Sequence, residues 1–139
     1  MNVTKYNAKD CTVAVDNVFI TQLGEDMVSG EKDEEFFEPS VGAQGDIVKN
    51  EVNNTLGTVT VTVQVTSPQK QHLLSLANRS ETFSLWVTNK SLGERFGGSM
   101  ASLKNYPEMA RGAEAEDMEF EFTVFDYTCL LYTSDAADD

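Results

Sequence analysis

The sequence has 139 residues and a formal net charge of -13, from 23 acidic against 10 basic side chains. A chain of this length predicts one domain with one hydrophobic core, and no apolar run approaches the roughly 18 residues needed to span a bilayer. The acidic balance favours solubility and argues against binding to nucleic-acid phosphates, which requires a basic patch.

The first regular segment is an expected β-hairpin. Residues 11–16 alternate apolar and polar side chains, and residues 18–21 form a second apolar run. Asp16 and Asn17 stand between the two runs and tolerate left-handed turn geometry, so a tight turn is expected there.

The segment 33–54 has a different composition. It mixes acids, glycines and one proline without clean alternation, which predicts a long loop. Yet it contains large apolar side chains that need a partner surface, either this domain's own core or a neighbouring chain. The candidate subunit-interface residues are Phe36, Phe37, Val41 and Ile47.

Residues 58–66 form the strand around which the fold is expected to be organised. Threonines and a glutamine alternate with valines without interruption, which is typical of a strand in an antiparallel sheet with one dry side. The valine face should be buried. The polar face, with Thr58, Thr60, Thr62 and Gln64, can face water.

A short amphipathic helix is expected over residues 68–79, with Ser67 as N-cap and Pro68 in its first turn. Further strands are expected at residues 27–32, 82–88, 99–104 and 118–125. The pattern predicts a mainly β protein, an antiparallel sandwich or barrel of six or seven strands with one short flanking helix.

Catalytic and metal-binding motifs do not emerge from the sequence. His72 is a lone imidazole without a paired cysteine, which makes neither a zinc site nor an activated nucleophile. Cys11 and Cys129 form no disulfide framework. Glu119 and Glu121 fit the wet face of the last strand better than an acid–base pair. We therefore expect no enzyme activity, no metal and no cofactor.

The last eleven residues, 129–139, resemble the translation of a transposase-based sequencing adapter, and every residue fits. The alternative is a native polar tail. We interpret the match as a non-native extension, so the expected single domain spans residues 1–128.

Three stretches carry a resemblance to a known family. They are VGAQGDIVKN at residues 41–50, NNTLGTVTV at residues 53–61 and TSPQ at residues 66–69. Together with Leu73, Leu76, Ala77 and Asn78, they are similar to short structural proteins of contractile-tailed phages and prophages that look like tail tube proteins. The resemblance covers nearly all of residues 5–127 and brings no catalytic residues with it.

The resemblance implies a tail-tube β-sandwich whose six copies form a ring, with rings stacked into a tube. The expected partners are further copies of the chain and the sheath, tape-measure and baseplate proteins. DNA would pass through without specific binding, no membrane would be involved, and the location would be the virion tail, assembled in the bacterial cytoplasm. Thr58, Thr60, Thr62 and Gln64 become candidate lumen-facing residues.

Other functions stay open at this point. Another tail part, such as a tail terminator or a baseplate hub protein, fits the same resemblance. A small β-sandwich that binds sugar or peptide is the alternative from a different class, with Trp86 and Tyr106 as its candidate exposed aromatics. A hydrolase has the least support.

Overall fold

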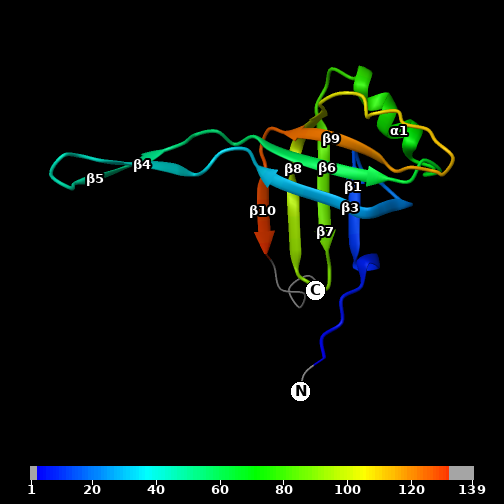
Figure 1. Ribbon diagram of the computed structural model, residues 1–139, viewed down its shortest axis with the longest axis horizontal. Helices are drawn as coiled ribbons and strands as arrows, with labels where there is room; N and C mark the ends of the chain where they lie inside the picture. The colour runs from blue at the N-terminus through cyan, green and yellow to red at the C-terminus, as the bar shows by residue number, and fades with distance from the viewer. Residues whose placement is uncertain (1–2, 132–139) are drawn as a thin grey trace.

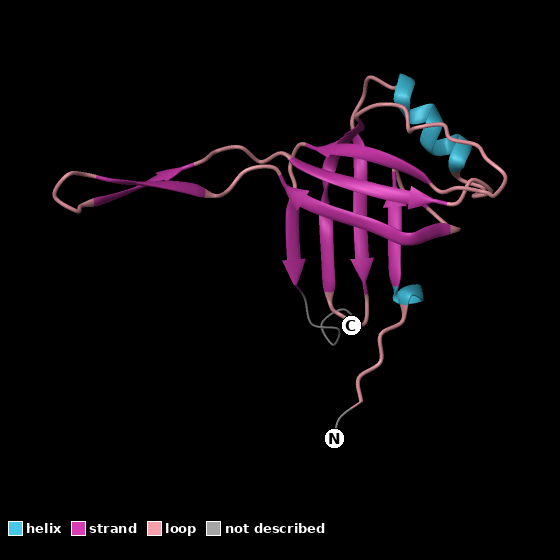
Figure 2. Ribbon diagram, viewed as in Figure 1, coloured by secondary structure: helices cyan, strands magenta, loops and turns pink. Residues whose placement is uncertain are grey.

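The computed structural model describes residues 3–131, and most of this chain is extended (Figures 1 and 2). The ten strands are β1 (Cys11–Val15), β2 (Val18–Phe19), β3 (Leu23–Lys32), β4 (Phe37–Val41), β5 (Ile47–Glu51), β6 (Gly57–Val63), β7 (Phe83–Asn89), β8 (Glu94–Leu103), β9 (Met118–Val124) and β10 (Thr128–Leu131). The helical elements are α1 (Lys70–Ser75) and the short 3-10 turns η1 (Ala8–Asp10) and η2 (Leu76–Asn78). The mainly β, antiparallel fold with one short helix is confirmed. The prediction of six or seven strands was too low, because β4, β5 and β10 were not expected.

Eight strands form one strongly bent antiparallel sheet in two layers. The hydrogen-bonded order is β2-β1-β7-β8-β9-β6-β3, and β10 pairs with the first part of β8 where β9 pairs with the last part. Figure 1 shows β1, β7, β8 and β10 running crosswise to β3, β6 and β9. The result is a sandwich of nearly orthogonal layers, in which a corner strand passes from one layer to the other.

β8 is that corner strand, and a bulge lets it bend. Leu85 pairs with Gly98 while Phe83 pairs with Ala101, so β8 contributes one residue more than β7 over this interval. Gly97 has a φ of 130°, and a β-carbon there would collide with the Leu85 carbonyl oxygen. Only glycine fits at such a position, and the extra residue bends the strand.

The carboxylate of Asp126 holds the bulge from outside. It accepts hydrogen bonds from the Ser99 amide at 3.1 Å, the Ser99 hydroxyl at 2.6 Å and the Met100 amide at 3.0 Å. Partial desolvation raises the pKa of Asp126, but these hydrogen bonds outweigh it and hold the pKa below its ordinary value. The turn after β9 therefore fixes the corner through a charged hydrogen-bond acceptor.

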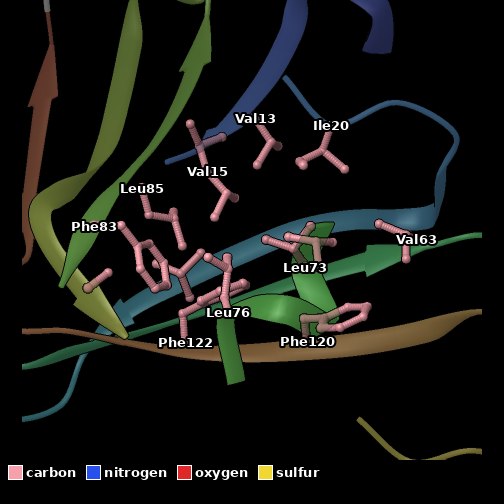
Figure 3. Packing of buried hydrophobic residues seen from close by; sticks show 14 of the residues in the cluster. Val13, Val15, Ile20, Val63, Leu73, Leu76, Phe83, Leu85, Phe120 and Phe122 are labelled. Atoms are coloured by element: carbon pink, nitrogen blue, oxygen red, sulfur yellow. The ribbon is translucent and has the colours of Figure 1, made fainter. Parts of the chain in front are cut away.

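The hydrophobic core lies between the two layers (Figure 3). The predicted burial of the valine face is confirmed for Val59, Val61 and Val63. The other buried strand side chains include Phe83, Leu85, Val87, Met118, Phe120, Phe122 and Val124. Phe83 and Phe122 meet edge to face across the layers, with ring centroids 6.0 Å apart. Leu73 of α1 and Leu76 of η2 are buried in the same cluster, so the helix covers one opening of the sandwich.

The first hairpin is confirmed, and the helix begins later than expected. Asp16 and Asn17 both have positive φ, 54° and 65°, as a two-residue turn of this type requires. Ser67 lies too early in the chain to be the N-cap: its hydroxyl donates to the Thr21 carbonyl at 2.8 Å and accepts from the Gln69 amide at 3.4 Å, within the turn before the helix. Gln69 takes the N-cap position instead, and α1 starts at Lys70.

Candidate assembly surfaces

The segment expected to be a long loop is a β-hairpin that projects from the body of the molecule (Figures 1 and 2). β4 and β5 pair in register from Phe37 opposite Glu51 to Val41 opposite Ile47. Gly45, with a φ of 94°, supports the turn between them. The loop prediction was wrong because the acids and Pro39 mask the alternation of the short β4. We call residues 33–54 the arm.

The register gathers most of the arm's large apolar side chains on one face, which we call its apolar face. Phe37, Pro39, Val41 and Ile47 lie there together with the charged Lys49 and Glu51, because cross-strand partners point the same way and side chains alternate along each strand. Glu38, Ser40, Val48 and Asn50 lie on the other face, where the Asn50 amide donates to the Glu38 carbonyl and the Ser40 hydroxyl.

The arm's apolar face has no core beneath it. Phe37, Val41 and Ile47 are 42%, 67% and 69% exposed. Lys49 places its ammonium 4.7 Å from the centre of the Phe37 ring, which shields part of that ring. A two-stranded hairpin is only marginally stable by itself, so a face of this kind is expected to cover another surface.

The structure brings together three of the four candidate interface residues. Phe36 precedes β4 and alternates with Phe37, so it points away from the apolar face. Phe36 is 75% exposed, and the Lys32 ammonium lies over its ring, 4.9 Å from the ring centre. Phe36 therefore belongs to the base of the arm.

The four candidate lumen-facing residues do not share one environment in the structure. Thr58 and Thr60 are half-buried on the outward face of β6. Thr62 is 7% exposed, because Gly24 on one side allows the chain to pack closely against it. Gln64 is exposed but lies beyond the end of β6.

The outward face of β3, β6 and β9 is polar and acidic. The register places Glu121 beside Thr60 and Glu119 beside Thr62. Both glutamates are exposed, as predicted. A hollow of about 470 Å³ opens over this face, and its lining includes Thr60, Glu119, Glu121, Tyr106 and Glu108. Lys104 pairs with Glu121 at 3.4 Å and neutralises part of the charge. Such a surface repels phosphate groups.

Sequence reasoning missed an apolar groove beside the first hairpin. Its volume is about 760 Å³, and the side chains that line it include Lys9, Cys11, Phe19, Ile20, Leu23 and Met27. Phe19 is 64% exposed there. The only signal for it is that Phe19, an aromatic residue, falls on the outward side of the short β2.

Residues 129–131, the first part of the expected non-native tail, continue β10 and pair with β8. Leu130 and Leu131 are 48% and 79% exposed. Residues 132–139 lie outside the described residues, and the interpretation of 129–139 as an extension stays a prediction.

The described residues provide little for catalysis. Within 3–131 no group of three or more His, Cys, Asp or Glu side chains is arranged to hold a metal ion. His72 lies half-buried with its Nε2 3.2 Å from the Val15 carbonyl oxygen. Burial, and secondarily the charge of Glu94, raises the pKa of the Cys11 thiol, which makes it a poor nucleophile. In the same range, no helix is long and apolar enough to cross a membrane.

The chain matches no protein-family model and no curated protein. Solved structures do share its fold. A chain from the sheath/tube terminator of an extracellular contractile injection system, PVC, in the extended state superposes with a TM-score of 0.67 at 14% identity, covering 94% of this chain and 99% of that one. A chain from the anti-feeding prophage cap, described as the AFP tube terminating cap, gives 0.65 at 12% identity, with 95% and 96% coverage. A chain from the PVC sheath-tube complex in the extended state gives 0.61 at 16% identity, with 88% of both chains covered.

Proposed function

We propose that this chain is a structural subunit of a contractile tail or injection particle, and that it acts at the terminating end of the particle's tube. The observation that carries this proposal is the end-to-end match of its fold with chains from two tube-terminating assemblies. The main expectation from the sequence was a subunit of the tube body. The terminator, then an alternative, is now the better supported function.

The surfaces of the described chain fit an assembly role. β2, β3 and β10 each pair on one side only in the described sheet, and unpaired edges are an aggregation hazard that ring closure removes. The arm offers an apolar face outside the core. In a ring of six, the acidic face of β3, β6 and β9 would line the passage and keep DNA from adhering.

A tube-body subunit is the second candidate. The fold match with a chain from a sheath-tube complex favours it, as does the sequence resemblance to tail tube proteins. Both candidates share the same partners: further copies, the adjoining tube and sheath, and more distantly the tape-measure and baseplate proteins. Both also place the chain in the particle, assembled in the cytoplasm of the producing cell.

Gold labelling of particles separates the two candidates. A peptide tag is added before Val3 and detected with nanogold on contracted particles, whose tubes are extruded, under negative-stain electron microscopy. A terminator gives label at one end of each tube. A tube subunit gives label along the extruded length, and particles without label would refute both functions.

A further inference from the structure

The outward faces of the two layers differ in charge. The layer of β3, β6 and β9 exposes Glu119 and Glu121. In the other layer, register and alternation turn a different set of positions outward: every second residue of 12–14, 84–88, 95–97 and 128–130. We call these positions the Trp86 face. They include Arg95 and no acid, in a chain whose formal net charge is -13.

Arg95 is held in place without an acidic partner. Its guanidinium carbon lies 4.0 Å from the centre of the Trp86 ring. Both side chains are half-buried, and the Arg95 Nε is buried without a hydrogen-bond acceptor among the described residues. In the same part of the chain, ion pairs form at Arg79 and Lys104 but not at Arg95. A buried donor that lacks an acceptor costs free energy, so this face is suited to a partner that brings one.

The acids around the Trp86 face are turned away from it or engaged elsewhere. Glu94 alternates with the arginine and lines a small pocket on the inner side of the layer. The carboxylate of Asp126 is held by the β8 bulge, and that of Asp16 by an ion pair. At the edge, Asp10 has the base Lys90 beside it, since its carbonyl accepts from the Lys90 amide at 3.2 Å. The guanidinium is therefore the charge that this face offers to a partner.

We propose that the Trp86 face docks a carboxylate-bearing segment of the sheath chain that surrounds the tube end. The inference rests on the proposed function and adds the surface for one of its partners. The outward faces of a two-layer sandwich point in opposite directions. If the acidic face of β3, β6 and β9 lines the passage, the Trp86 face points away from it, towards the surrounding chains. Neighbouring copies in a ring meet through the sides of the subunit, so a second copy is the poorer occupant.

The chemistry of the face defines the segment that it fits. A guanidinium stacked on an indole has already lost much of its rotamer freedom, and it can form two parallel hydrogen bonds with one carboxylate. Tryptophan and arginine are also the side chains that most often dominate the energy of an interface. The register partners of Trp86 are the small residues Ala14 and Gly97, which leave room beside its ring. The expected segment therefore carries an Asp or Glu next to an apolar side chain.

Photo-crosslinking in assembled particles tests the contact. A benzophenone amino acid replaces Thr88, which pairs with Arg95 across β7 and β8, and in a second protein it replaces Glu119 on the opposite layer. Purified particles are irradiated, and mass spectrometry maps the joined peptides. We expect the probe at position 88 to join a sheath peptide that contains Asp or Glu, and the probe at position 119 not to do so. No cross-link from position 88, cross-links only to copies of this chain, or a sheath cross-link from position 119 instead would overturn the inference.

A charge exchange tests the role of the guanidinium. Arg95→Glu should lower the fraction of particles that contain this chain at least about tenfold, and Lys in place of the mapped carboxylate should restore it. Arg111→Glu is the matched control, because Arg111 is exposed in the loop before β9, outside the Trp86 face. Urea denaturation shows whether Arg95→Glu folds, and Arg95→Gln replaces it if it does not. Normal incorporation of the Arg95 variant, or no restoration by the exchanged charge, would refute the contact.

The outcome is separable from that of the proposed function. Gold-labelled particles without a cross-link from position 88 would refute the docking contact alone. Particles without label would refute the particle role itself, and the sheath contact with it.

Discussion

The ring of Tyr127 occupies the space that a side chain at Gly57 would fill. A β-carbon on Gly57 would collide with the Cβ, Cγ and Cδ1 atoms of Tyr127. The Tyr127 hydroxyl also approaches Gly30, which lies on the neighbouring β3. The chain after β9 therefore packs on two glycines of adjacent strands, and partial burial raises the pKa of Tyr127, with the charges of Cys129 and Glu31 adding to the effect.

Replacing Gly57 with alanine is expected to lower the free energy of unfolding by about 1–3 kcal/mol, the usual cost of forcing extra atoms into a packed site. Urea denaturation followed by tryptophan fluorescence measures it through Trp86. Gly42→Ala is the control, because the nearest atom to a β-carbon there is 3.7 Å away. Equal stability of the two variants would contradict the packing of Tyr127 on Gly57.

Replacing Asp126 with asparagine should weaken the corner of β8. Hydrogen bonds to a charged acceptor contribute about 1.5–3 kcal/mol, and the half-exposed position reduces this, so we expect a loss of about 1 kcal/mol at pH 7. The folded pKa of Asp126 is lowered, so its contribution is present above the unfolded pKa of about 3.9 and is lost as the pH falls through the lower folded value.

The measurement is the difference in unfolding free energy between wild type and Asp126→Asn, followed from pH 7 to pH 2. Glu114→Gln, at an exposed position in the loop before β9, controls for the general loss of negative charge. A difference that stays constant below pH 3 would mean that the carboxylate charge does not hold the bulge.

Phe36 and Phe37 should respond differently to substitution, although they are adjacent. Phe37→Ser removes a ring from the apolar face of the arm, and self-association should weaken. Phe36→Ser removes a ring that points to the other side, and association should stay close to that of the wild type. Both variants should unfold within about 0.5 kcal/mol of the wild type, as is usual for surface substitutions. Analytical ultracentrifugation and urea denaturation give the two readouts, and a large loss of stability in either variant would place its ring in the subunit's own core.

Deleting residues 129–139 should leave the fold intact and cost less than about 1 kcal/mol, the scale of an ordinary single substitution. The side chains of Leu130 and Leu131 are largely exposed, so the deletion removes β10 pairing but little apolar burial. Circular dichroism and urea denaturation of the truncated chain provide the test. A greater loss would show that β10 was selected to pack, against the adapter interpretation.

The sequence predicted those strands in which apolar and polar side chains alternate because one face packs on the core and the other faces outward. β6 and β9 each have one face against the core, and the strands expected at residues 58–66 and 118–125 both form. The arm obeys the same alternation from Phe37 to Val41, but its dry face has no core within the chain, and Pro39 with the neighbouring acids conceals it.

The polar face of β6 was predicted only in part. Thr58 and Thr60 face outward, but Thr62 is buried because it packs closely against Gly24. The alternation of residues along a strand cannot predict such a tertiary contact. The groove at Phe19 was missed for a similar reason. Its walls come from β1, β2 and β3, and they become neighbours only when the sheet bends.

The base of the arm separates the arm's length from the register of the body. Residues 33–36 and 52–56 connect the arm to β3 and β6 and belong to no strand. Residues added or removed there would leave the pairing of β3 with β6 in place, because strand register is fixed only where the ladder runs. Chains that share this architecture can therefore carry arms of different reach on the same core.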